Sequence, residues 1–385
     1  MKVLWICALP LRVQREVFGD TDHGAQVAAS WIVAHLPPPP GIDLHLACLW
    51  PGGDQRKTAT YDGATVHLLP CPRRGRALLL FQRDTSYFQP LFAELRPEVV
   101  HAWGTEDSYG LVARRLAPSH HVIGIQGLIT AYRKRVAMHR RDTLTALTER
   151  LTLAKANCVV AESEYSLREA RALCRADTKL KVVEHPLRRE FLAATAANST
   201  GKVVLFVGLL QERKGIRDAV EAFAKAAPSD WRLQVIGAGR PTEEQSVERL
   251  AERLQLQDRF QHRRACGAEE LVQTMQASSV FLLPTRIDTG PTALKEALTM
   301  GLWPVCYDNS GPGEYIRKYG FGSLAIDGDI ESLTKTLRQV LQQRSWEQTS
   351  KRAALAARTR HDFSSERAWR DLLDCYAAVA RGNTK

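Results

Sequence analysis

The stretch that decides the fold runs Phe281-Leu-Leu-Pro-Thr-Arg-Ile-Asp-Thr-Gly-Pro-Thr-Ala-Leu-Lys-Glu-Ala-Leu-Thr-Met-Gly301. It predicts a buried strand that ends at Pro284, a polar loop, and a helix that begins with Gly290 and Pro291 and ends at Gly301. The amides of residues 292–294 have no intrahelical acceptor and lie at the positive end of the helix dipole. We therefore expect an anion site there, with phosphate as the anion.

Two carboxylates flank this helix start. Asp288 precedes the helix, and Glu296 lies about five residues into it, roughly 7.5 Å along its axis. The two side chains can therefore face opposite ends of one long ligand. A second turn, 206–215, places Lys214 before another helix, where its ammonium can balance phosphate charge. A solvated lysine beside the helix-initiating Gly215 is the alternative.

Short β-rich runs alternate with stretches of helical period along the chain, which indicates parallel sheets covered by helices. Strands are expected in the first half at 2–7, 43–48, 64–69, 98–103, 121–126, 157–161 and 180–184. In the second half they are expected at 202–207, 231–236, 259–262, 279–283, 303–307 and 322–326. We predict an α/β fold with two Rossmann-like domains, 1–191 and 202–364, joined by the small-residue stretch 192–201. The domains are expected to face a central ligand-binding cleft.

Length and composition agree with this organisation. A chain of 385 residues is long enough for about two domains. Its 44% hydrophobic and 25% charged residues exclude disordered, collagen-like and disulfide-scaffold proteins. With 53 Lys and Arg against 42 Asp and Glu, the net charge is 53 − 42 = +11, which predicts an anionic partner.

Other features favour a cytoplasmic location. The eight cysteines lack metal-ligand spacing and indicate reduced thiols. Pro10 and Arg12 interrupt the opening apolar run, which argues against a signal peptide. No apolar run approaches the roughly twenty residues that span a bilayer, so any membrane contact is expected to be peripheral, on the cytosolic face.

Four elements, in order, resemble the glycosyltransferases of family 4, which have the GT-B fold. They are Val-Gly-Leu-Leu-x-x-x-Lys-Gly at 207–215, Val-Ile-Gly-Ala-Gly at 235–239, Asp288 with Glu296, and Gly-Leu-Trp-Pro-Val at 301–305. The similarity covers nearly the whole chain and is strongest in its second half. It implies retaining transfer of a sugar from a nucleotide-diphosphate donor, UDP-sugar first and GDP-sugar second. The implied acceptor is a glycan or glycolipid in cell-surface polysaccharide or lipopolysaccharide biosynthesis, and no cofactor or metal is implied.

The resemblance also implies roles for individual residues. Lys214 would bind the donor diphosphate, Glu296 the nucleotide ribose, and Asp288 the hydroxyls of the transferred sugar. Gly24 would approach the diphosphate from the first domain, and the C-terminal helix 365–380 would pack back onto that domain. The other residues that we assign to donor binding are Gly208, Arg213, Gly237, Arg264, Gly290, Pro291, Thr292 and Ala293.

Three positions depart from the family pattern. Asp288 is one methylene shorter than the usual glutamate, and Leu209 stands where relatives often carry arginine, a role that Arg213 could take. Gln126 stands where many relatives have histidine, and an amide cannot titrate near neutral pH. General-base catalysis is therefore not expected at Gln126, and the leaving diphosphate would receive the acceptor proton. We assign Lys214, Asp288 and Gln126 to catalysis, with a nucleotide-sugar-binding or regulatory protein that has lost catalysis as the alternative.

The stretch 132–141 carries five permanent cations. It is either a solvated helix face or a surface for anionic lipid or a phosphorylated lipid-linked acceptor. Nucleic acid is not expected, because interleaved aromatic residues and a dedicated binding motif are lacking. We place Arg133 and Glu106 on the acceptor side, although Glu106 could equally cap the helix that follows it.

Two further motifs have structural explanations. Asp20-Thr-Asp22 resembles a metal-binding triplet of another glycosyltransferase fold, but it precedes a helix, where Asp and Thr are expected as caps. Gly237-Ala-Gly239 lacks the third glycine of a dinucleotide fingerprint, since Thr242 takes its place. A metal site and an oxidoreductase are therefore not expected.

Overall fold

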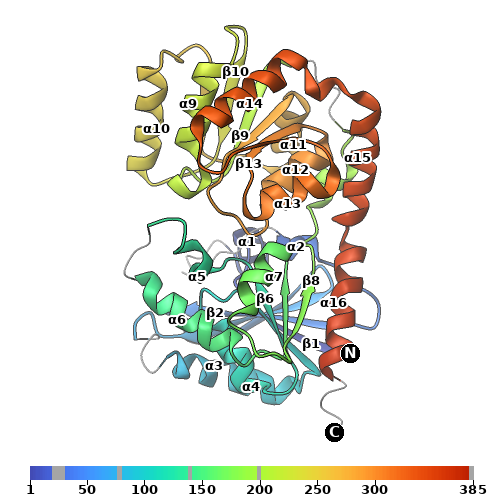
Figure 1. Ribbon diagram of the computed structural model, residues 1–385. Coiled ribbons are helices and arrows are strands. Elements are labelled where there is room, and N and C mark those ends of the chain that lie inside the picture. Colours follow the sequence, from blue (N-terminus) through green and yellow to red (C-terminus); the bar gives the residue numbers. More distant parts are fainter. Residues whose placement is uncertain (20–30, 76–79, 138–140, 197–200, 381–385) are drawn as a thin grey trace. The chain divides into compact units, whose positions relative to one another are not determined.

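The computed structural model describes residues 1–19, 31–75, 80–137, 141–196 and 201–380. The chain forms two compact units, one comprising Met1–Pro186 with Ser365–Lys385 and the other Leu187–Ser364. Each unit consists of a mainly parallel sheet with helices packed on it (Figure 1). The predicted α/β class with two Rossmann-like domains is therefore confirmed.

The sheet of the first unit has the strand order β3-β4-β2-β1-β5-β6-β7-β8, and only β3 runs antiparallel to its neighbour among the described strands. The strands are β1 (Lys2–Ile6), β2 (Asp43–Pro51), β3 (Lys57–Tyr61), β4 (Ala64–Cys71), β5 (Val99–Trp103), β6 (His121–Ile125), β7 (Cys158–Ala161) and β8 (Lys179–Val182). The helices are α1 (Leu11–Phe18), α2 (Trp31–Ala34), α3 (Gln82–Leu95), α4 (Tyr109–Leu116), α5 (Ile129–Tyr132), α6 (Arg141–Leu153), α7 (Glu164–Arg171) and α16 (Ser365–Ala380).

The sheet of the second unit has the order β11-β10-β9-β12-β13-β14 and is parallel throughout. Its strands are β9 (Val203–Val207), β10 (Arg232–Ile236), β11 (Phe260–Arg263), β12 (Val280–Leu283), β13 (Trp303–Tyr307) and β14 (Ser323–Ala325). The α-helices are α8 (Arg189–Ala193), α9 (Ile216–Ala226), α10 (Pro241–Arg253), α11 (Ala268–Gln276), α12 (Thr292–Met300), α13 (Ser310–Tyr319), α14 (Ile330–Gln343) and α15 (Thr349–Asp362). Two 3-10 turns, η1 (Glu212–Lys214) and η2 (Ser345–Glu347), complete the described elements.

Both sheets reverse their direction of growth at a central pair of strands. In the second unit the chain adds β10 and β11 on one side of β9, and β12, β13 and β14 on the other. In the first unit the corresponding central pair is β1 and β5. Loops that leave such a pair at its carboxyl end diverge and leave a crevice, where ligands of doubly wound sheets bind. The topology therefore predicts ligand binding at the loops after β9 and β12, and at those after β1 and β5.

The boundary between the units differs from the one expected. The sequence assigned residues 187–191 to the first domain, but they belong to the second unit. Helix α8 packs against α11 and α12, Phe191 is fully buried in the second core, and the Leu187 N–H donates to the Phe363 carbonyl at 3.0 Å. The small-residue composition of 192–201 predicted the linker there. The tertiary contacts of 187–191 instead place the division between Pro186 and Leu187.

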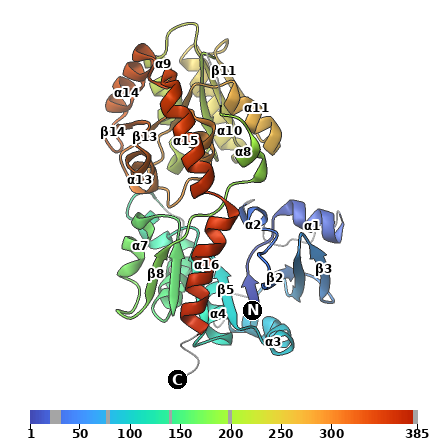
Figure 2. The same ribbon diagram turned by 90° about the vertical axis from the view of Figure 1, so that its right-hand side faces the viewer.

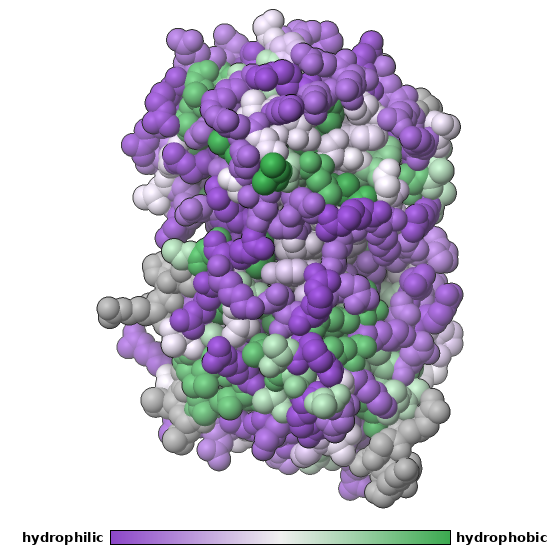
Figure 3. All heavy atoms as spheres, in the orientation of Figure 1, coloured by the Kyte–Doolittle hydropathy of each residue, from purple (hydrophilic) through white to green (hydrophobic). Residues whose placement is uncertain are grey.

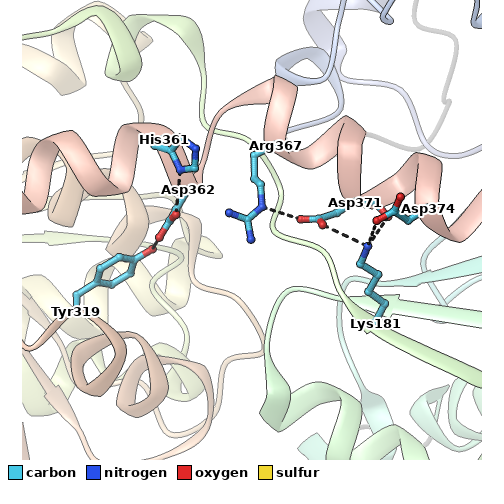
Figure 4. A network of polar contacts seen from close by, with 7 residues as sticks. All are labelled: Lys181, Tyr319, His361, Asp362, Arg367, Asp371 and Asp374. Atoms are coloured by element: carbon cyan, nitrogen blue, oxygen red, sulfur yellow. Dashed lines mark hydrogen bonds and ion pairs between the residues drawn. The ribbon is translucent and has the colours of Figure 1, made fainter.

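The C-terminal helix α16 lies on β5 and β6 of the first unit (Figure 2). The indole N–H of Trp369 donates to the His35 carbonyl at 2.6 Å, and the hydroxyl of Tyr376 accepts the Trp5 indole N–H at 2.9 Å. Polar contacts add to this packing (Figure 4). Lys181 of β8 forms ion pairs with two α16 carboxylates, Asp371 at 3.2 Å and Asp374 at 2.9 Å.

A prediction follows from the buried hydroxyl of Tyr376. It also hydrogen-bonds His101 Nδ1 at 2.7 Å, so Tyr376→Phe leaves two buried polar groups without this partner. We expect a loss of about 1–3 kcal/mol in the free energy of unfolding, measured by urea denaturation followed by tryptophan fluorescence.

The matched control is Tyr61→Phe, because Tyr61 is partly exposed on β3 in the same unit and its hydroxyl meets Glu16. Water can replace that contact, so the control is expected to change stability by well under half as much. Equal losses in the two variants would contradict the role given to the buried hydroxyl.

Candidate active site

The turn after β9 and the loop after β12 lie against each other at the carboxyl edge of the second sheet. The Arg286 N–H donates to the Arg213 carbonyl at 2.8 Å. Gly215 has φ of 73°, and a Cβ at this position would lie 1.8 Å from the carbonyl oxygen of Pro284. Only glycine allows this backbone approach. It brings Lys214 beside the β12 loop.

Lys214 forms an ion pair with Asp288. The carboxylate is 7% exposed and the lysine side chain 17% exposed. Burial opposes ionisation of Asp288, but the charges of Lys214 and Arg213 outweigh it and hold the pKa of Asp288 below its usual value. Arg213 Nη1 also donates to the Ile287 carbonyl at 3.1 Å. The site therefore keeps Asp288 ionised between two cations.

The backbone around Asp288 is fixed by the start of α13, which follows β13. The Asp288 N–H donates to Ser310 Oγ at 3.0 Å, and its carbonyl accepts the Gly311 N–H at 2.9 Å. A Cβ at Gly311 would lie 2.9 Å from the Asp288 carbonyl oxygen, so this contact also depends on glycine. Asp288 is thus held through both its backbone and its side chain.

Helix α12 begins where the sequence predicted. Pro291 is the residue before its first turn, and Gly301, with φ of 76°, ends it. Thr292 and Ala293 are partly exposed at the helix start, where geometry leaves their amides without intrahelical acceptors. The expectation of a free amide at residue 294 is wrong, because the Leu294 N–H donates to the Pro291 carbonyl at 2.9 Å. A tight first turn accounts for the difference.

Glu296 is buried farther along α12, with its side chain 5% exposed. Its Oε1 accepts a hydrogen bond from Arg188 Nη2 at 2.9 Å. Burial raises the pKa of Glu296, and the Arg188 charge opposes this rise. Sequence reasoning missed Arg188, which is 108 residues away in the chain and carries no motif.

Other residues that the sequence assigned to donor binding lie along the same edge. A Cβ at Gly237 would lie 1.7 Å from the Gly208 carbonyl oxygen, so the turns after β9 and β10 also touch. Arg264 pairs with Glu244 at 2.9 Å, and the same carboxylate accepts the Gly239 N–H at 3.0 Å. The second unit thus brings together loops from β9, β10, β11 and β12. The residues that the sequence assigned to donor binding and that lie in the second unit are Gly208, Arg213, Lys214, Gly237, Arg264, Asp288, Gly290, Pro291, Thr292, Ala293 and Glu296.

In the first unit, Glu106 and Gln126 lie around Gly104, at the carboxyl ends of β5 and β6. A Cβ at Gly104 would lie 3.1 Å from Glu106 Oε2 and 3.9 Å from Gln126 Oε1. One at Gly127 would lie 2.4 Å from Glu106 Oε1. The Thr105 N–H donates to Glu106 Oε2 at 3.0 Å, whereas no side chain caps the start of α4. The capping alternative for Glu106 is therefore wrong.

A second carboxylate, Glu149 of α6, lies close to this group. Its oxygens accept the N–H groups of Ile129 and Thr130 at 2.8 and 2.9 Å, which fixes the start of α5. Burial raises the pKa of Glu106 to about 7, and the nearby Glu149 charge adds to the rise. Sequence reasoning missed Glu149, because a mid-helix glutamate shows no signal of burial in the sequence.

Gly24 and Asp20-Thr-Asp22 are outside the described residues. Arg133 is exposed at the end of α5 and lines a groove with α6. Within the part of the chain that the structure describes, no three His, Cys, Asp or Glu side chains gather as a metal site would require. Independence of a metal stays a prediction.

Comparison with known proteins follows the same division of the chain. Residues 188–362 match the family model of group 1 glycosyl transferases, and residues 23–185 match that of the glycosyl transferase 4-like domain. The GDP-mannose:cellobiosyl-diphosphopolyprenol alpha-mannosyltransferase of Xanthomonas campestris is 28% identical over 217 residues, which is 55% of this chain and 56% of the relative. The 2-deoxystreptamine glucosyltransferase of Streptomyces kanamyceticus is 28% identical over 218 residues, 56% and 54% of the two chains. The chain thus spans about half the length of these relatives.

Solved structures of similar fold cover nearly the whole chain. Sucrose-phosphate synthase from Thermosynechococcus elongatus has a TM-score of 0.79 at 16% identity, over 98% of this chain and 99% of its own. Anabaena Alr3699/HepE in complex with UDP and glucose has a TM-score of 0.71 at 14% identity, over 98% and 100%. The family models divide where the two sheets divide, and the fold matches over both. The chain therefore belongs to the GT-B glycosyltransferases of the family 4 type.

Proposed function

We propose that the protein is a retaining glycosyltransferase that transfers a hexose from a nucleoside-diphosphate donor to a glycan or lipid-linked acceptor. The observation that carries this proposal is the pairing of Lys214 with a buried Asp288 directly before the start of α12. A cation, first-turn amides and two carboxylates, Asp288 and Glu296, are thereby arranged along one helix. Such a row suits a ligand with a sugar, a diphosphate and a ribose in series.

The diphosphate would bind between Lys214 and the amides of Thr292 and Ala293. An ammonium has three donors, so Lys214 can keep Asp288 and also contact a phosphate oxygen. The helix start adds partial positive charge at the same place. Both groups stabilise the charge that develops on the leaving diphosphate, and the diphosphate can then take the acceptor proton. This division of work requires no titrating base at Gln126.

The acceptor would bind in the first unit beside Gln126 and Glu106. The amide can donate and accept hydrogen bonds, and the carboxylate of Glu106 can accept one from an acceptor hydroxyl. These contacts would orient the hydroxyl for attack, and orientation of reactants is a major part of catalysis. Glu149 supports the arrangement because it fixes the backbone at Ile129 and Thr130.

The donor is proposed to be a UDP-sugar, with a GDP-sugar as the second choice. HepE has been solved in complex with UDP and glucose, and the name of the Xanthomonas relative gives GDP-mannose as its donor. The same relative is named for a diphosphopolyprenol-linked acceptor, and a Salmonella typhimurium relative for colanic acid biosynthesis. These names support synthesis of a cell-surface polysaccharide or glycolipid as the setting of the reaction.

The first test is Lys214→Ala. We expect sugar transfer to fall by about 10² to 10³-fold, because one charge-assisted contact to the leaving group is lost. The measurement is nucleotide release from UDP-sugars and GDP-sugars, with thermal shifts to show which of them the wild-type protein binds.

The matched control is Lys225→Ala, which removes an exposed lysine from α9 of the same unit. Transfer by Lys214→Ala at the wild-type rate would refute the assignment. Nucleotide release without acceptor in the wild-type protein would exclude the alternative of a binding protein without catalysis.

The second test uses the pKa of Glu106. With a pKa of about 7, this carboxyl ionises between pH 6 and 8, and only the ionised form is purely a hydrogen-bond acceptor. We expect kcat/KM for the acceptor to rise through pH 7 in the wild-type protein and to lose this rise in Glu106→Gln.

The control for this test is Asp107→Asn, one residue away, whose carboxylate accepts the Ser108 N–H at 2.7 Å instead. It should keep the rise but move it to somewhat lower pH, because the Asp107 charge contributes to the raised pKa of Glu106. If Glu106→Gln retained the same rise, Glu106 would not be the titrating group.

We further propose that the protein meets an anionic lipid surface through a groove between α5 and α6. The groove has a volume of about 870 Å³, and its lining includes Arg133, Lys134 and Arg150 together with Leu144 and Leu147. The two leucines are 37% and 44% exposed, and Lys134 pairs with Glu169 at 2.7 Å. Figure 3 shows green apolar side chains among purple hydrophilic ones on the face of this unit that it draws. Exposed leucines with cations around them match the acyl edge and phosphates of a bilayer. No helix among the described residues has the length and hydropathy to cross a bilayer.

The test is sedimentation with phosphatidylglycerol vesicles and with phosphatidylcholine vesicles. Arg133→Gln/Arg150→Gln should reduce binding to the anionic vesicles by about tenfold or more, since each cation near such a surface contributes about 1 kcal/mol. The control Arg249→Gln/Arg253→Gln removes two exposed arginines from α10 of the second unit. Tight binding of duplex DNA without vesicle binding would overturn this proposal.

A further inference from the structure

Arg188 is anchored at the start of the second unit. It is the residue before α8, and its carbonyl accepts the Phe191 N–H at 3.0 Å. Its guanidinium carbon lies 4.9 Å from the centroid of the Phe191 ring, which is fully buried. The backbone N–H of the preceding residue, Leu187, donates a hydrogen bond to the Phe363 carbonyl. The guanidinium therefore starts from a fixed backbone and a fixed aromatic surface.

From this anchor Arg188 reaches Glu296 on α12, with 2.9 Å between Nη2 and Oε1. The arginine side chain is 23% exposed and the glutamate 5%. An ion pair this shielded from water has a large effect on its partner, because the removal of one charge leaves the other buried and unpaired. Water cannot take the place of Arg188 at little cost, as it could at the surface.

The groups around Glu296 make Arg188 the principal counter-charge. Lys295 adds positive charge from the next position of α12 but lies over the Phe363 ring, at 5.4 Å from its centroid. The charge of Glu190 on α8 raises the pKa of Glu296. Cys266, which follows β11, is close enough for the charges of both Arg188 and Glu296 to act on its thiol. On α15, Arg352 lies at the far end of α12, 3.4 Å from where a Cβ of Gly301 would be.

We propose that Arg188 is a positioning residue that keeps Glu296 ionised and oriented for the ribose of the donor. This inference rests on the proposed function, in which Glu296 accepts hydrogen bonds from the ribose hydroxyls. An ionised carboxylate offers only acceptors, whereas a protonated one presents a donor on one oxygen. Arg188 uses one nitrogen for this contact and therefore leaves the second carboxylate oxygen to the ligand.

The sign of the expected pH effect follows from the contacts. Burial raises the pKa of Glu296, and Arg188 opposes that rise. Removal of the guanidinium therefore raises the pKa of Glu296 further, so a larger fraction of the carboxyl is protonated at any given pH. A defect caused in this way is corrected by raising the pH, whereas loss of packing is not.

The experiment measures the Kd of UDP, and of GDP in parallel, by calorimetry between pH 6.5 and 9. Arg188→Met keeps the aliphatic stem and removes the charge. We expect it to weaken nucleotide binding by about tenfold at pH 7 and to recover toward the wild-type Kd at pH 9, because more of the carboxyl is ionised as the pH rises. Arg188→Lys keeps the charge, and its Kd at pH 7 should lie between those of the wild-type protein and Arg188→Met. Arg189→Met is the matched control, because it removes an exposed neighbouring arginine.

Glu296→Gln separates this inference from the proposed function. Glu296→Gln should weaken binding at every pH, and Arg188→Met/Glu296→Gln should bind no more weakly than Glu296→Gln alone, because Arg188 acts through the carboxylate. Wild-type binding by Arg188→Met, a loss that is equal at all pH values, or a further loss in the double variant would overturn the inference. Wild-type binding by Glu296→Gln, or no binding of either nucleotide by the wild-type protein, would overturn the donor site itself. Melting temperatures of all variants identify any that fail to fold.

Discussion

A carboxylate that stays ionised out of water needs a cation or several hydrogen-bond donors beside it, and the second unit provides a cation for Asp288 and another for Glu296. Asp288 has Lys214, supplied by the turn after β9, and Glu296 has Arg188, supplied by the segment before α8. Lys214 and Arg188 both come from outside α12 and the loop before it, so the two carboxylates meet their partners only when the second unit is folded. The reversal of sheet growth between β9 and β12 places the first pair. The packing of α8 on α12 places the second.

In the first unit, the carboxylates of Glu106 and Glu149 are stabilised by hydrogen-bond donors. No ion pair to a cation is present at Glu106 or Glu149 among the described residues; backbone N–H groups and hydroxyls serve them instead. The pKa of Glu106 accordingly rises to about 7, whereas the pKa of Asp288 is lowered by its two cations. Buried carboxyl groups thus differ in their titration, with the pKa of Asp288 lowered by two cations and that of Glu106 raised by burial. If donor and acceptor bind as proposed, lasting charge at Asp288 faces the donor and the titrating Glu106 faces the acceptor hydroxyl.

Much of the fold could be predicted because its strands are continuous apolar runs and its helices have clear ends. Thirteen strands lie where the sequence placed them, within three residues at each end, and Gly301 ends α12 as expected. The sequence missed β3, whose residues alternate between partly exposed and exposed, because an edge strand of five residues buries too little to show a pattern. The unit boundary was wrong for a related reason, since Phe191 is held by tertiary contacts and not by its neighbours in sequence.

The site was predictable where residues close in sequence act together, as Asp288, Pro291 and Gly301 do around α12. It was not predictable where partners are distant. Arg188 meets Glu296 across 108 residues, and Glu149 meets Ile129 across 20. Local sequence also could not show that the first turn of α12 is tight enough to engage the Leu294 amide.

The departures from the family pattern become connected once the contacts are known. Leu209 is 47% exposed, and Arg213, the candidate to replace the missing arginine, donates to the Ile287 carbonyl and acts on Asp288. Arg213 therefore adds positive charge beside the shorter carboxylate. If the donor binds as proposed, the diphosphate depends on Lys214 and the start of α12 for its charge balance. The shorter Asp288 then lies where positive charge from both Lys214 and Arg213 is concentrated.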